Sequence, residues 1–390
     1  MKCEWKRIRV GDLGTIITGK TPPTKKAEYW GGNIHFITPK DLQGTKHVLQ
    51  TDRFITGMGL ESVRGCKLPS DAVCVSCIGN IGYVAMTRQT CISNQQINSI
   101  IANENYDPDF VYYLMKSLWP FFKNYEGQST TLSILNKTQF SKIEIVTPDL
   151  PEQKKIASIL SSLDDKIELN NKINENLERQ AQAFYQELFI NNADVEWPQG
   201  TISDLGIVVG GSTPSKSKPE YYTENGIAWI TPKDLSTNKS KFISHGKNDI
   251  TELGLKSSSA TIMPKGTVLF SSRAPIGYIA IAAGEAATNQ GFKSVIPKPE
   301  IGTAFVYYFL KHNLPVIEGM ASGSTFKEIS GSTMKNVPAV IPDIDTLKQF
   351  NNFCVPIFAQ QQFLEKQNSS LTKLRDTILP KLMSSDITVG

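Results

Sequence analysis

The chain has 390 residues, of which 40% are hydrophobic and 20% charged, with a formal net charge of +4. This composition is typical of a globular protein of two or three domains. No apolar run approaches the roughly 20 residues of a membrane helix, and the first residues lack the apolar stretch of a signal peptide, so we expect a cytoplasmic protein without membrane contact. The weak net charge by itself does not indicate a nucleic-acid partner.

The sequence contains two copies of one pattern. The segment ITPKDL occupies 37–42 and returns unchanged at 230–235. Further matches follow in the same order: DLG at 12–14 and 204–206, NQ at 94–95 and 289–290, and FVYY at 110–113 and 305–308. The shift stays between 192 and 195 residues, so the chain is an internal duplication.

Each copy has the same predicted elements in chain order. Short stretches rich in Val, Ile and Phe alternate with Gly, Pro, Asn and Ser, which predicts short strands joined by turns. The aromatic segments from Asp109 to Tyr125 and from Thr303 to Ile317 each predict one helix, with its aromatic residues in the core. A long helix is then predicted after each copy, beginning near Pro151 in the first.

The long segments carry a seven-residue hydrophobic repeat, which predicts a coiled coil. In the first segment the two seams are Ile156, Leu163, Asn170, Leu177 and Phe184, and Leu160, Ile167, Asn174, Ala181 and Leu188. In the second they are Phe350, Ile357, Leu364, Leu371 and Ile378, and Cys354, Gln361, Asn368, Arg375 and Leu382. Asn174 and Asn368 occupy equivalent seam positions and are candidates for fixing the register; the alternative is two solvated side chains near a frayed seam.

The predicted fold is α+β: two tandem globular copies, separated by two long helices that form an antiparallel coiled coil with pseudo-twofold symmetry. The expected boundaries are 1–150 for the first copy, 151–192 for its helix, 193–345 for the second copy and 346–390 for its helix. Because the first helix leads into the second copy, a returning second helix must run antiparallel. We therefore expect an elongated molecule with the two copies held apart.

Two apparent chemical motifs fail on their context. The segment GTIITGKT at 14–21 fits the phosphate-loop pattern, but two prolines follow where a helix should begin, and the second copy has Ser212 in place of the lysine. Asp149 and Glu152 suggest a nuclease metal site, but they lie in one short turn, and the second copy lacks the glutamate. Neither nucleotide nor metal binding is expected.

The cysteines and histidines likewise give no site. Cys74 and Cys77 form one Cys-x-x-Cys pair, but they lie in an apolar stretch, 73–78, that favours a buried strand over a zinc site. The four histidines are scattered and unmatched between the copies: His35, His47, His245 and His312. We therefore predict that the chain is non-catalytic, with no cofactor and no metal.

Six motifs follow one another along the first copy: GKTP at 19–22, YW at 29–30, TPKDL at 38–42, NQ at 94–95, FVYY at 110–113 and PEQ at 151–153. With these motifs the whole chain resembles the specificity subunit of type I restriction-modification enzymes. The resemblance implies two target recognition domains that bind a bipartite site in double-stranded DNA. It also implies two methyltransferase subunits and the restriction (translocase) subunits as partners, which supply the catalysis.

The sequence departs from the family pattern in the second long helix. The residues IDTL at 344–347 replace the PEQ opening, and Asn351, Asn352 and Pro356 are poor helix formers. We therefore expect its first turns to be weakly helical.

The duplication also suggests which residues contact DNA. Residues identical in both copies are expected to form the frame, whereas residues that differ within it are candidates for base contacts. Arg, Asn and Gln pair with guanine or adenine edges, so Arg273, Asn80 and Gln96 are the leading candidates. The complete set of candidate DNA-binding residues is Lys25, Lys26, Lys40, Asn80, Asn94, Gln96, Lys216, Lys218, Lys233, Arg273, Asn289 and Lys293.

Two alternatives remain open at this point. The candidate residues can simply be loop residues that face solvent. The chain can also be a non-catalytic tandem interaction or ligand-binding scaffold that does not bind DNA. A DNA-binding module that assembles a larger enzyme is the favoured interpretation.

Overall fold

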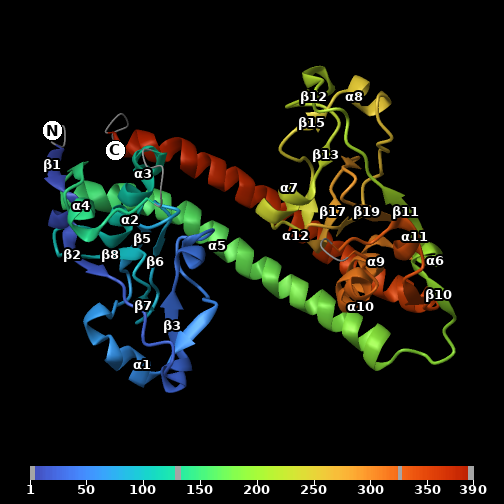
Figure 1. The fold of residues 1–390 in the computed structure, drawn as a ribbon, viewed down its shortest axis with the longest axis horizontal. Helices are drawn as coiled ribbons and strands as arrows, with labels where there is room; N and C mark the ends of the chain where they lie inside the picture. Colours follow the sequence, from blue (N-terminus) through green and yellow to red (C-terminus); the bar gives the residue numbers. More distant parts are fainter. Residues whose placement is uncertain (1–4, 128–132, 324–326, 385–390) are drawn as a thin grey trace. The chain divides into compact units, whose positions relative to one another are not determined.

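The computed structural model describes residues 5–127, 133–323 and 327–384 (Figure 1). The chain divides into unit 1, formed by Met1–Leu169 with Asn368–Gly390, and unit 2, formed by Asn170–Gln367. The two long helices are α5 (Leu150–Gln186), which continues in a π-helical turn at Glu187–Asn191, and α12 (Ile344–Met383). Each unit therefore contains one copy of the repeat and a section of both long helices.

Unit 1 is built on an antiparallel four-stranded sheet with the order β2-β8-β5-β6. These strands are β2 (Gly14–Thr18), β5 (Val73–Ser76), β6 (Val84–Met86) and β8 (Ile97–Ala102). A second sheet, β4-β3-β7, and the pair β1-β9 are formed by β1 (Lys6–Arg9), β3 (Trp30–Ile37), β4 (Arg53–Ile55), β7 (Ile92–Ser93) and β9 (Glu144–Thr147). The helices are α1 (Gly57–Ser62), α2 (Pro108–Ser117), α3 (Trp119–Gly127) and α4 (Lys137–Ser141).

Unit 2 repeats this plan. Its main sheet has the order β11-β19-β16-β17-β14, and three strand pairs, β10-β20, β12-β15 and β13-β18, surround it. The strands are β10 (Gln199–Thr201), β11 (Gly206–Gly210), β12 (Tyr222–Thr223), β13 (Trp229–Ile230), β14 (Phe242–Ile243), β15 (Asp249–Ile250), β16 (Val268–Ser272), β17 (Ile276–Ala282), β18 (Ala287–Thr288), β19 (Lys293–Pro297) and β20 (Pro338–Val340). The helices are α6 (Ile202–Leu205), α7 (Pro232–Thr237), α8 (Glu252–Lys256), α9 (Thr303–His312), α10 (Leu314–Gly319) and α11 (Gly331–Lys335).

The strand registers confirm the duplication. Ile37 pairs with Ser93 in parallel in unit 1, and its equivalent Ile230 pairs with Thr288 in parallel in unit 2. Short 3-10 turns complete both units: Val10–Leu13, Ala27–Tyr29, Pro39–Leu42, Arg64–Cys66 and Pro219–Tyr221. The predicted α+β fold with two tandem copies and two long helices is therefore confirmed.

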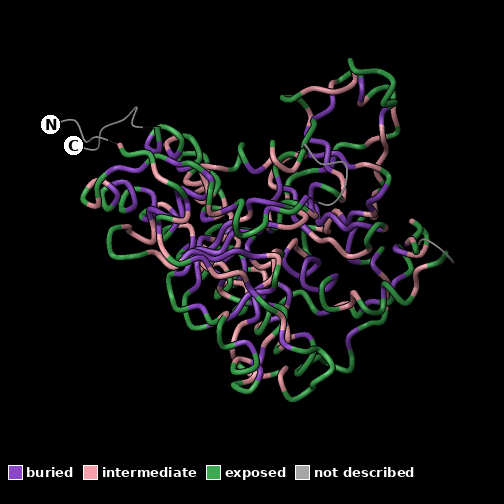
Figure 2. Tube along the Cα trace, turned by 60° about the vertical axis from the view of Figure 1, so that its left-hand side comes forward, coloured by how far each residue is buried: buried purple, intermediate pink, exposed green. Residues whose placement is uncertain are grey.

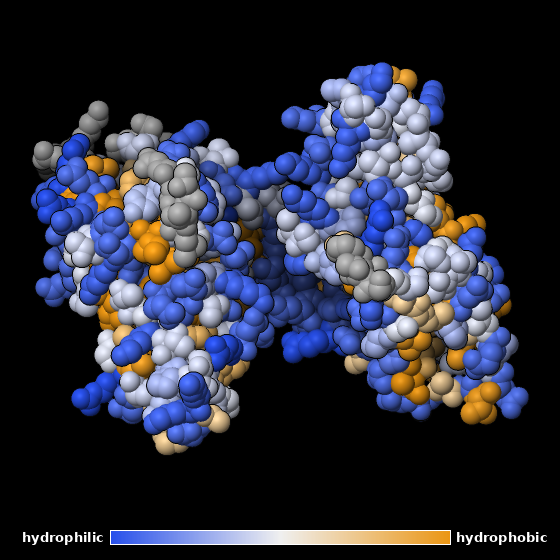
Figure 3. Space-filling model, viewed as in Figure 1, coloured by the Kyte–Doolittle hydropathy of each residue, from blue (hydrophilic) through white to orange (hydrophobic). Residues whose placement is uncertain are grey.

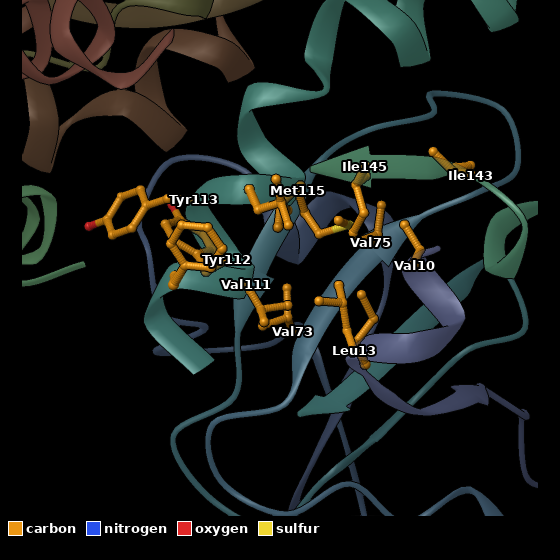
Figure 4. Packing of buried hydrophobic residues seen from close by; sticks show 14 of the residues in the cluster. Val10, Leu13, Val73, Val75, Val111, Tyr112, Tyr113, Met115, Ile143 and Ile145 are labelled. Atoms are coloured by element: carbon orange, nitrogen blue, oxygen red, sulfur yellow. The ribbon is translucent and has the colours of Figure 1, made fainter. Parts of the chain in front are cut away.

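Each unit encloses its own hydrophobic core. In unit 1 the side chains of β5 and α2 meet those of β9, as Val75, Met115 and Ile145 show (Figure 4). The same core includes Ile156 from α5 and Leu382 from α12. Buried segments run through the interior of the fold and exposed segments trace its loops (Figure 2). The long helices are thus an integral part of both cores rather than free linkers.

The predicted seams of the long helices are confirmed. None of the twenty predicted seam residues is exposed, whereas residues between them, such as Glu175 and Lys366, are. In unit 1 Asp164 of α5 pairs with Arg375 of α12, and in unit 2 Phe184 stacks against Phe350 at 6.0 Å. The later a residue of α5 lies in the sequence, the earlier lies the residue of α12 that it contacts. The two helices are therefore antiparallel.

The expected weak start of the second long helix is wrong. Helix α12 begins at Ile344 and continues through Pro356. Leu347, Phe350 and Cys354 are almost completely buried there, so packing outweighs the poor helix propensity of the intervening residues. Asp343 caps the helix, because its carboxylate accepts hydrogen bonds from two backbone N–H groups and a threonine hydroxyl of the first turn.

The aromatic segments also differ from the prediction. Each forms two helices rather than one: α2 and α3 in unit 1, and α9 and α10 in unit 2. Pro120 and Pro315 lie in the first turn of the second helix of each pair, where the missing N–H costs nothing, whereas inside one continuous helix it would remove a hydrogen bond. The placement of the aromatic side chains of α2 and α9 in the core is confirmed.

Two further segments bear on function. The phosphate-loop-like sequence begins in strand β2, which pairs with β8 along its whole length, and therefore lacks the loop before a helix that binds phosphate. The stretch around Cys74 is the fully buried strand β5, as predicted. In the described part of the chain, no helix is both long and apolar enough to cross a bilayer.

Candidate functional site

Unit 2 has an open groove of about 1140 Å³ beside its main sheet. Four candidate residues from separate segments line it: Lys216, Lys233, Arg273 and Asn289. The groove is also lined by Tyr222, Trp229, His245 and Lys247, which no sequence motif indicated. The lysines and Arg273 together make a cationic surface suited to a polyanion.

Two residues identical in both copies have a structural role in this region. Asp41 and Asp234 each accept hydrogen bonds from the backbone N–H and the hydroxyl of the threonine three residues earlier. The adjacent Lys40 and Lys233 are exposed. Lys40 Nζ lies 2.7 Å from a carboxylate oxygen of Asp52, and this hydrogen bond raises the pKa of the lysine. Lys233, which lines the groove, remains a candidate phosphate contact.

The matched asparagines also have a structural role. Asn94 Oδ1 accepts a hydrogen bond from Gln96 N at 3.1 Å, and Asn289 Oδ1 accepts one from Gly291 N at 2.9 Å. In unit 1 the Gln96 side chain also accepts from Asn94 Nδ2 at 2.8 Å. The two bonds to backbone N–H groups shape the same turn in both units. The bond from Asn94 Nδ2 also holds the side-chain amide of Gln96 in place.

Arg273 and Lys293 share one carboxylate at the edge of the groove. Arg273 Nη1 lies 3.3 Å from Glu328 Oε2, and Lys293 Nζ lies 3.9 Å from Glu328 Oε1. Burial lowers the pKa of Lys293. The negative charge of Glu328 partly opposes this shift, and the positive charge of Arg273 adds to it. No local sequence pattern indicated Glu328, because it lies more than 50 residues along the chain from Arg273.

The remaining candidates lie on exposed loops. Lys25 and Lys26 follow β2, and Lys26 Nζ lies 3.2 Å from the Tyr29 hydroxyl. Asn80 is exposed in the loop after β5, where its backbone oxygen accepts a hydrogen bond from Ser76 Oγ at 2.7 Å. Lys218 Nζ lies 3.6 Å from Glu220 Oε1. These geometries do not test the DNA-binding assignment, which remains a prediction.

A pair of buried lysines was missed in the sequence. Lys46 and Lys241 are equivalent in the repeat, and their side chains are only 3% and 7% exposed. Lys46 Nζ contacts Asp109 at 2.8 Å and Ser161 Oγ of α5 at 2.9 Å. The repeat itself contained a signal, since a lysine is retained at this position in both copies, 195 residues apart.

Lys241 ties its unit to both long helices. Its ammonium group pairs with Glu178 of α5 and donates to Gln361 Oε1 of α12 at 2.7 Å. Burial would raise the pKa of Glu178, but the attraction of Lys241 and Lys311 outweighs it and lowers the value to about 2. Burial lowers the pKa of Lys241 itself. The position of each globular copy on the helices is thus fixed by a buried charge as well as by packing.

The two candidate register residues lie in the helix seam. Gln361 Nε2 donates to the backbone oxygen of Asn174 at 3.2 Å, and the neighbouring Asn170 Nδ2 donates to Gln367 Oε1 at 2.7 Å. Asn368 is half-buried. A polar layer therefore interrupts the hydrophobic seam here, but its effect on register remains a prediction.

Three cysteines of unit 1 are buried in its core. Cys74, Cys77 and Cys91 are free thiols in the core, and burial raises the pKa of Cys74 to about 11 and that of Cys77 to about 12. Within the described residues, no three His, Cys, Asp or Glu side chains are grouped as a metal site would require.

Comparison with known proteins gives matches along the whole chain. The sequence profile of the type I restriction modification DNA specificity domain matches residues 2–179 and again 194–372. The chain is 29% identical to the type I restriction enzyme MjaIX specificity subunit of Methanocaldococcus jannaschii, over 99% of this chain and 94% of that protein. It is 35% identical to the HindI specificity subunit of Haemophilus influenzae, over 44% of this chain and 39% of that protein. The crystal structure of the S subunit of a type I restriction-modification system from M. genitalium has the same fold, with a TM-score of 0.61 at 18% identity over 98% of this chain and 96% of that chain.

Proposed function

Because the chain belongs to the family of type I restriction modification DNA specificity domains, we propose that it recognises a bipartite sequence in double-stranded DNA. Each unit recognises one half of the target, and the part between the halves is not contacted by base-specific side chains. The chain assembles with two methyltransferase subunits and with restriction subunits. These partners carry out the catalysis, and this chain selects the sequence.

The observation that carries the proposal is the groove of unit 2. Lys233 and Lys216 supply positive charge for phosphate groups, which position a protein on DNA. Arg273 lies at the edge of the same groove, and arginine is the side chain that most often recognises guanine. The residues of the frame around them are shared with unit 1, whereas Arg273 is not.

The proposal also explains why a duplicated fold differs at selected positions. Two units with one frame dock on DNA in the same manner, so their target halves differ only where their contacting side chains differ. Gln96 and Asn98 of unit 1 are replaced by Gly291 and Lys293 in unit 2. Different side chains at these positions imply a target whose two halves are unlike.

The test is a unit exchange followed by mapping of methylated adenines. The chain is reconstituted with its methyltransferase partner, and residues 193–345 are replaced by a second copy of 1–150. We expect the target to become palindromic with its spacer roughly preserved. A target altered in both halves, or a changed spacer, contradicts the modular recognition proposed here. Absence of sequence-dependent band shifts with the wild-type complex would instead favour a scaffold that does not bind DNA.

A further inference from the structure

The two units place different side chains at one equivalent position beside the main sheet. Leu135 N donates a hydrogen bond to Cys77 O at 2.8 Å in unit 1, and Ile329 N donates to Ser272 O at 3.0 Å in unit 2. These matched bonds align the two backbones independently of the side chains. The residues next to them, Ile78 and Ile134, therefore correspond to Arg273 and Glu328.

The chemistry at this position is opposite in the two units. In unit 2 it is charged, since Arg273 Nη1 lies 3.3 Å from Glu328 Oε2. In unit 1 it is apolar, since Ile78 and Ile134 pair in an antiparallel β-bridge. On the same backbone frame, the ion pair of unit 2 suits a polar group of a ligand, and the isoleucine pair of unit 1 suits an apolar one.

The isoleucine pair presents hydrocarbon to solvent. Ile134 is 50% exposed and Ile78 is half-buried. Both units show hydrophobic patches on an otherwise largely hydrophilic face (Figure 3), so exposure alone does not identify a site. Ile134 is distinguished by its fixed position, because its backbone oxygen accepts a hydrogen bond from the Tyr125 hydroxyl at 3.1 Å and its bridge to Ile78 holds it beside the end of β5.

The surroundings indicate what this apolar pair contacts. Asn80, an exposed candidate for base contacts, lies in the same loop, two residues after Ile78. Gln96 is adjacent through the bond from Cys77 N to Gln96 O at 2.7 Å. On the edges of the base pairs in the major groove, the apolar group is the 5-methyl of thymine. An apolar pair among amide side chains therefore matches a base pair that contains thymine.

We propose that Ile78 and Ile134 of unit 1 recognise the 5-methyl group of a thymine in the half of the target that unit 1 contacts. The inference rests on the proposed function and adds the chemical feature that one unit recognises. At the equivalent position of unit 2, the Arg273 guanidinium recognises a hydrogen-bond acceptor instead. The isoleucine pair in one unit and the ion pair in the other account for a difference between the two halves of the target without any change of the shared backbone frame.

The test uses the complex of the full chain with its methyltransferase partner, and DNA selected by that complex. A library of random duplexes is enriched by binding to the wild-type complex, and the recovered sequence is then remade with each thymidine replaced in turn by deoxyuridine, which lacks the methyl group. We expect one or two replacements, all in one half of the target, to weaken binding about fourfold, the value of one buried methyl-sized group. The variant Ile134→Ala should bind the thymine and uracil duplexes equally.

A matched control separates this effect from a general loss of binding. Val146 of β9 is an exposed aliphatic residue of the same unit, and Val146→Ala should keep the wild-type preference for thymine. Ile134→Thr, which keeps the β-branched shape and one γ-methyl group, guards against local disorder and should keep part of the preference that Ile134→Ala loses. Arg273→Ala should alter only the other half of the target.

The outcomes of the test are distinguishable. If a sequence is recovered but no deoxyuridine replacement weakens binding, or if Ile134→Ala still prefers thymine, the inference is wrong and the proposed function stands. If no sequence is enriched, the proposed function fails, and the inference fails with it.

Discussion

Removal of the buried ammonium group in unit 2 tests whether that charge holds the globular copy on the long helices. In Lys241→Met the apolar stem keeps its packing, but Glu178 and Gln361 lose the ammonium group that pairs with the carboxylate and donates to the amide. Glu178 retains Lys311 Nζ at 2.7 Å and the Tyr308 hydroxyl at 2.9 Å. The Glu178 carboxylate therefore loses one of its two lysine partners but keeps the other and the tyrosine hydroxyl.

The magnitude follows from these remaining contacts. Loss of one partner from a buried ion pair costs about 3–5 kcal/mol, and a buried polar atom left without its hydrogen bond costs about 1–3 kcal/mol. The side chain of Glu178 is 22% exposed and keeps a second lysine. The cost of losing Lys241 therefore lies toward the lower end of the range of about 3–5 kcal/mol. We expect the free energy of unfolding of unit 2 to fall by about 2–4 kcal/mol.

Hydrogen exchange measured by mass spectrometry is the suitable assay, because it reports on each unit separately. Backbone amides of β16, β17 and α9 should exchange faster in Lys241→Met, whereas those of β5 and α2 in unit 1 should not change. Addition of Glu178→Gln to Lys241→Met should restore part of the protection, because the unpaired carboxylate is then neutral.

Two control variants accompany this measurement. Lys233→Met removes an exposed lysine of the same unit and should leave exchange unchanged. Lys46→Met, the equivalent change in unit 1, should cost less, about 1–2 kcal/mol, because its partner Asp109 is 39% exposed and can be hydrated. Unchanged exchange in Lys241→Met, or faster exchange spread equally over both units, would refute the reasoning.

Four further predictions concern single sites. Because the pKa of Glu178 is lowered from 4.5 to about 2, unit 2 should lose up to about 3 kcal/mol as the pH falls from 4.5 through 2, and acid titration of Glu178→Gln should lack this loss. Arg273→Ala should cost about 1–3 kcal/mol of binding and relax one base preference; an equal loss on all sequences would indicate a phosphate contact. Tyr113→Phe removes a 2.7 Å hydrogen bond to Asp164 and should lower the urea stability of unit 1 by about 1–2 kcal/mol. Lys20→Ala should leave assembly and DNA cleavage by the full complex nearly unchanged; nucleotide binding to the wild-type chain that this variant abolishes would contradict it.

The sequence by itself determined the features that depend on spacing along the chain. The duplication is visible as ordered matches, and the seams of α5 and α12 follow from a seven-residue repeat, because residues at that spacing share one face of a helix. The burial of β5 follows from a short apolar run between turn residues. These patterns are local, so they do not require knowledge of the fold.

Only the tertiary structure decided features that depend on residues far apart in sequence. Helix α12 continues through Pro356 because Phe350 and Cys354 are buried against the rest of unit 2, which a propensity argument cannot include. Likewise, Glu328 pairs with Arg273, and Ile134 lies beside Ile78, only once the chain has folded. A charge or an apolar group acquires its role from the neighbour that the fold supplies, and that neighbour is not encoded in local spacing.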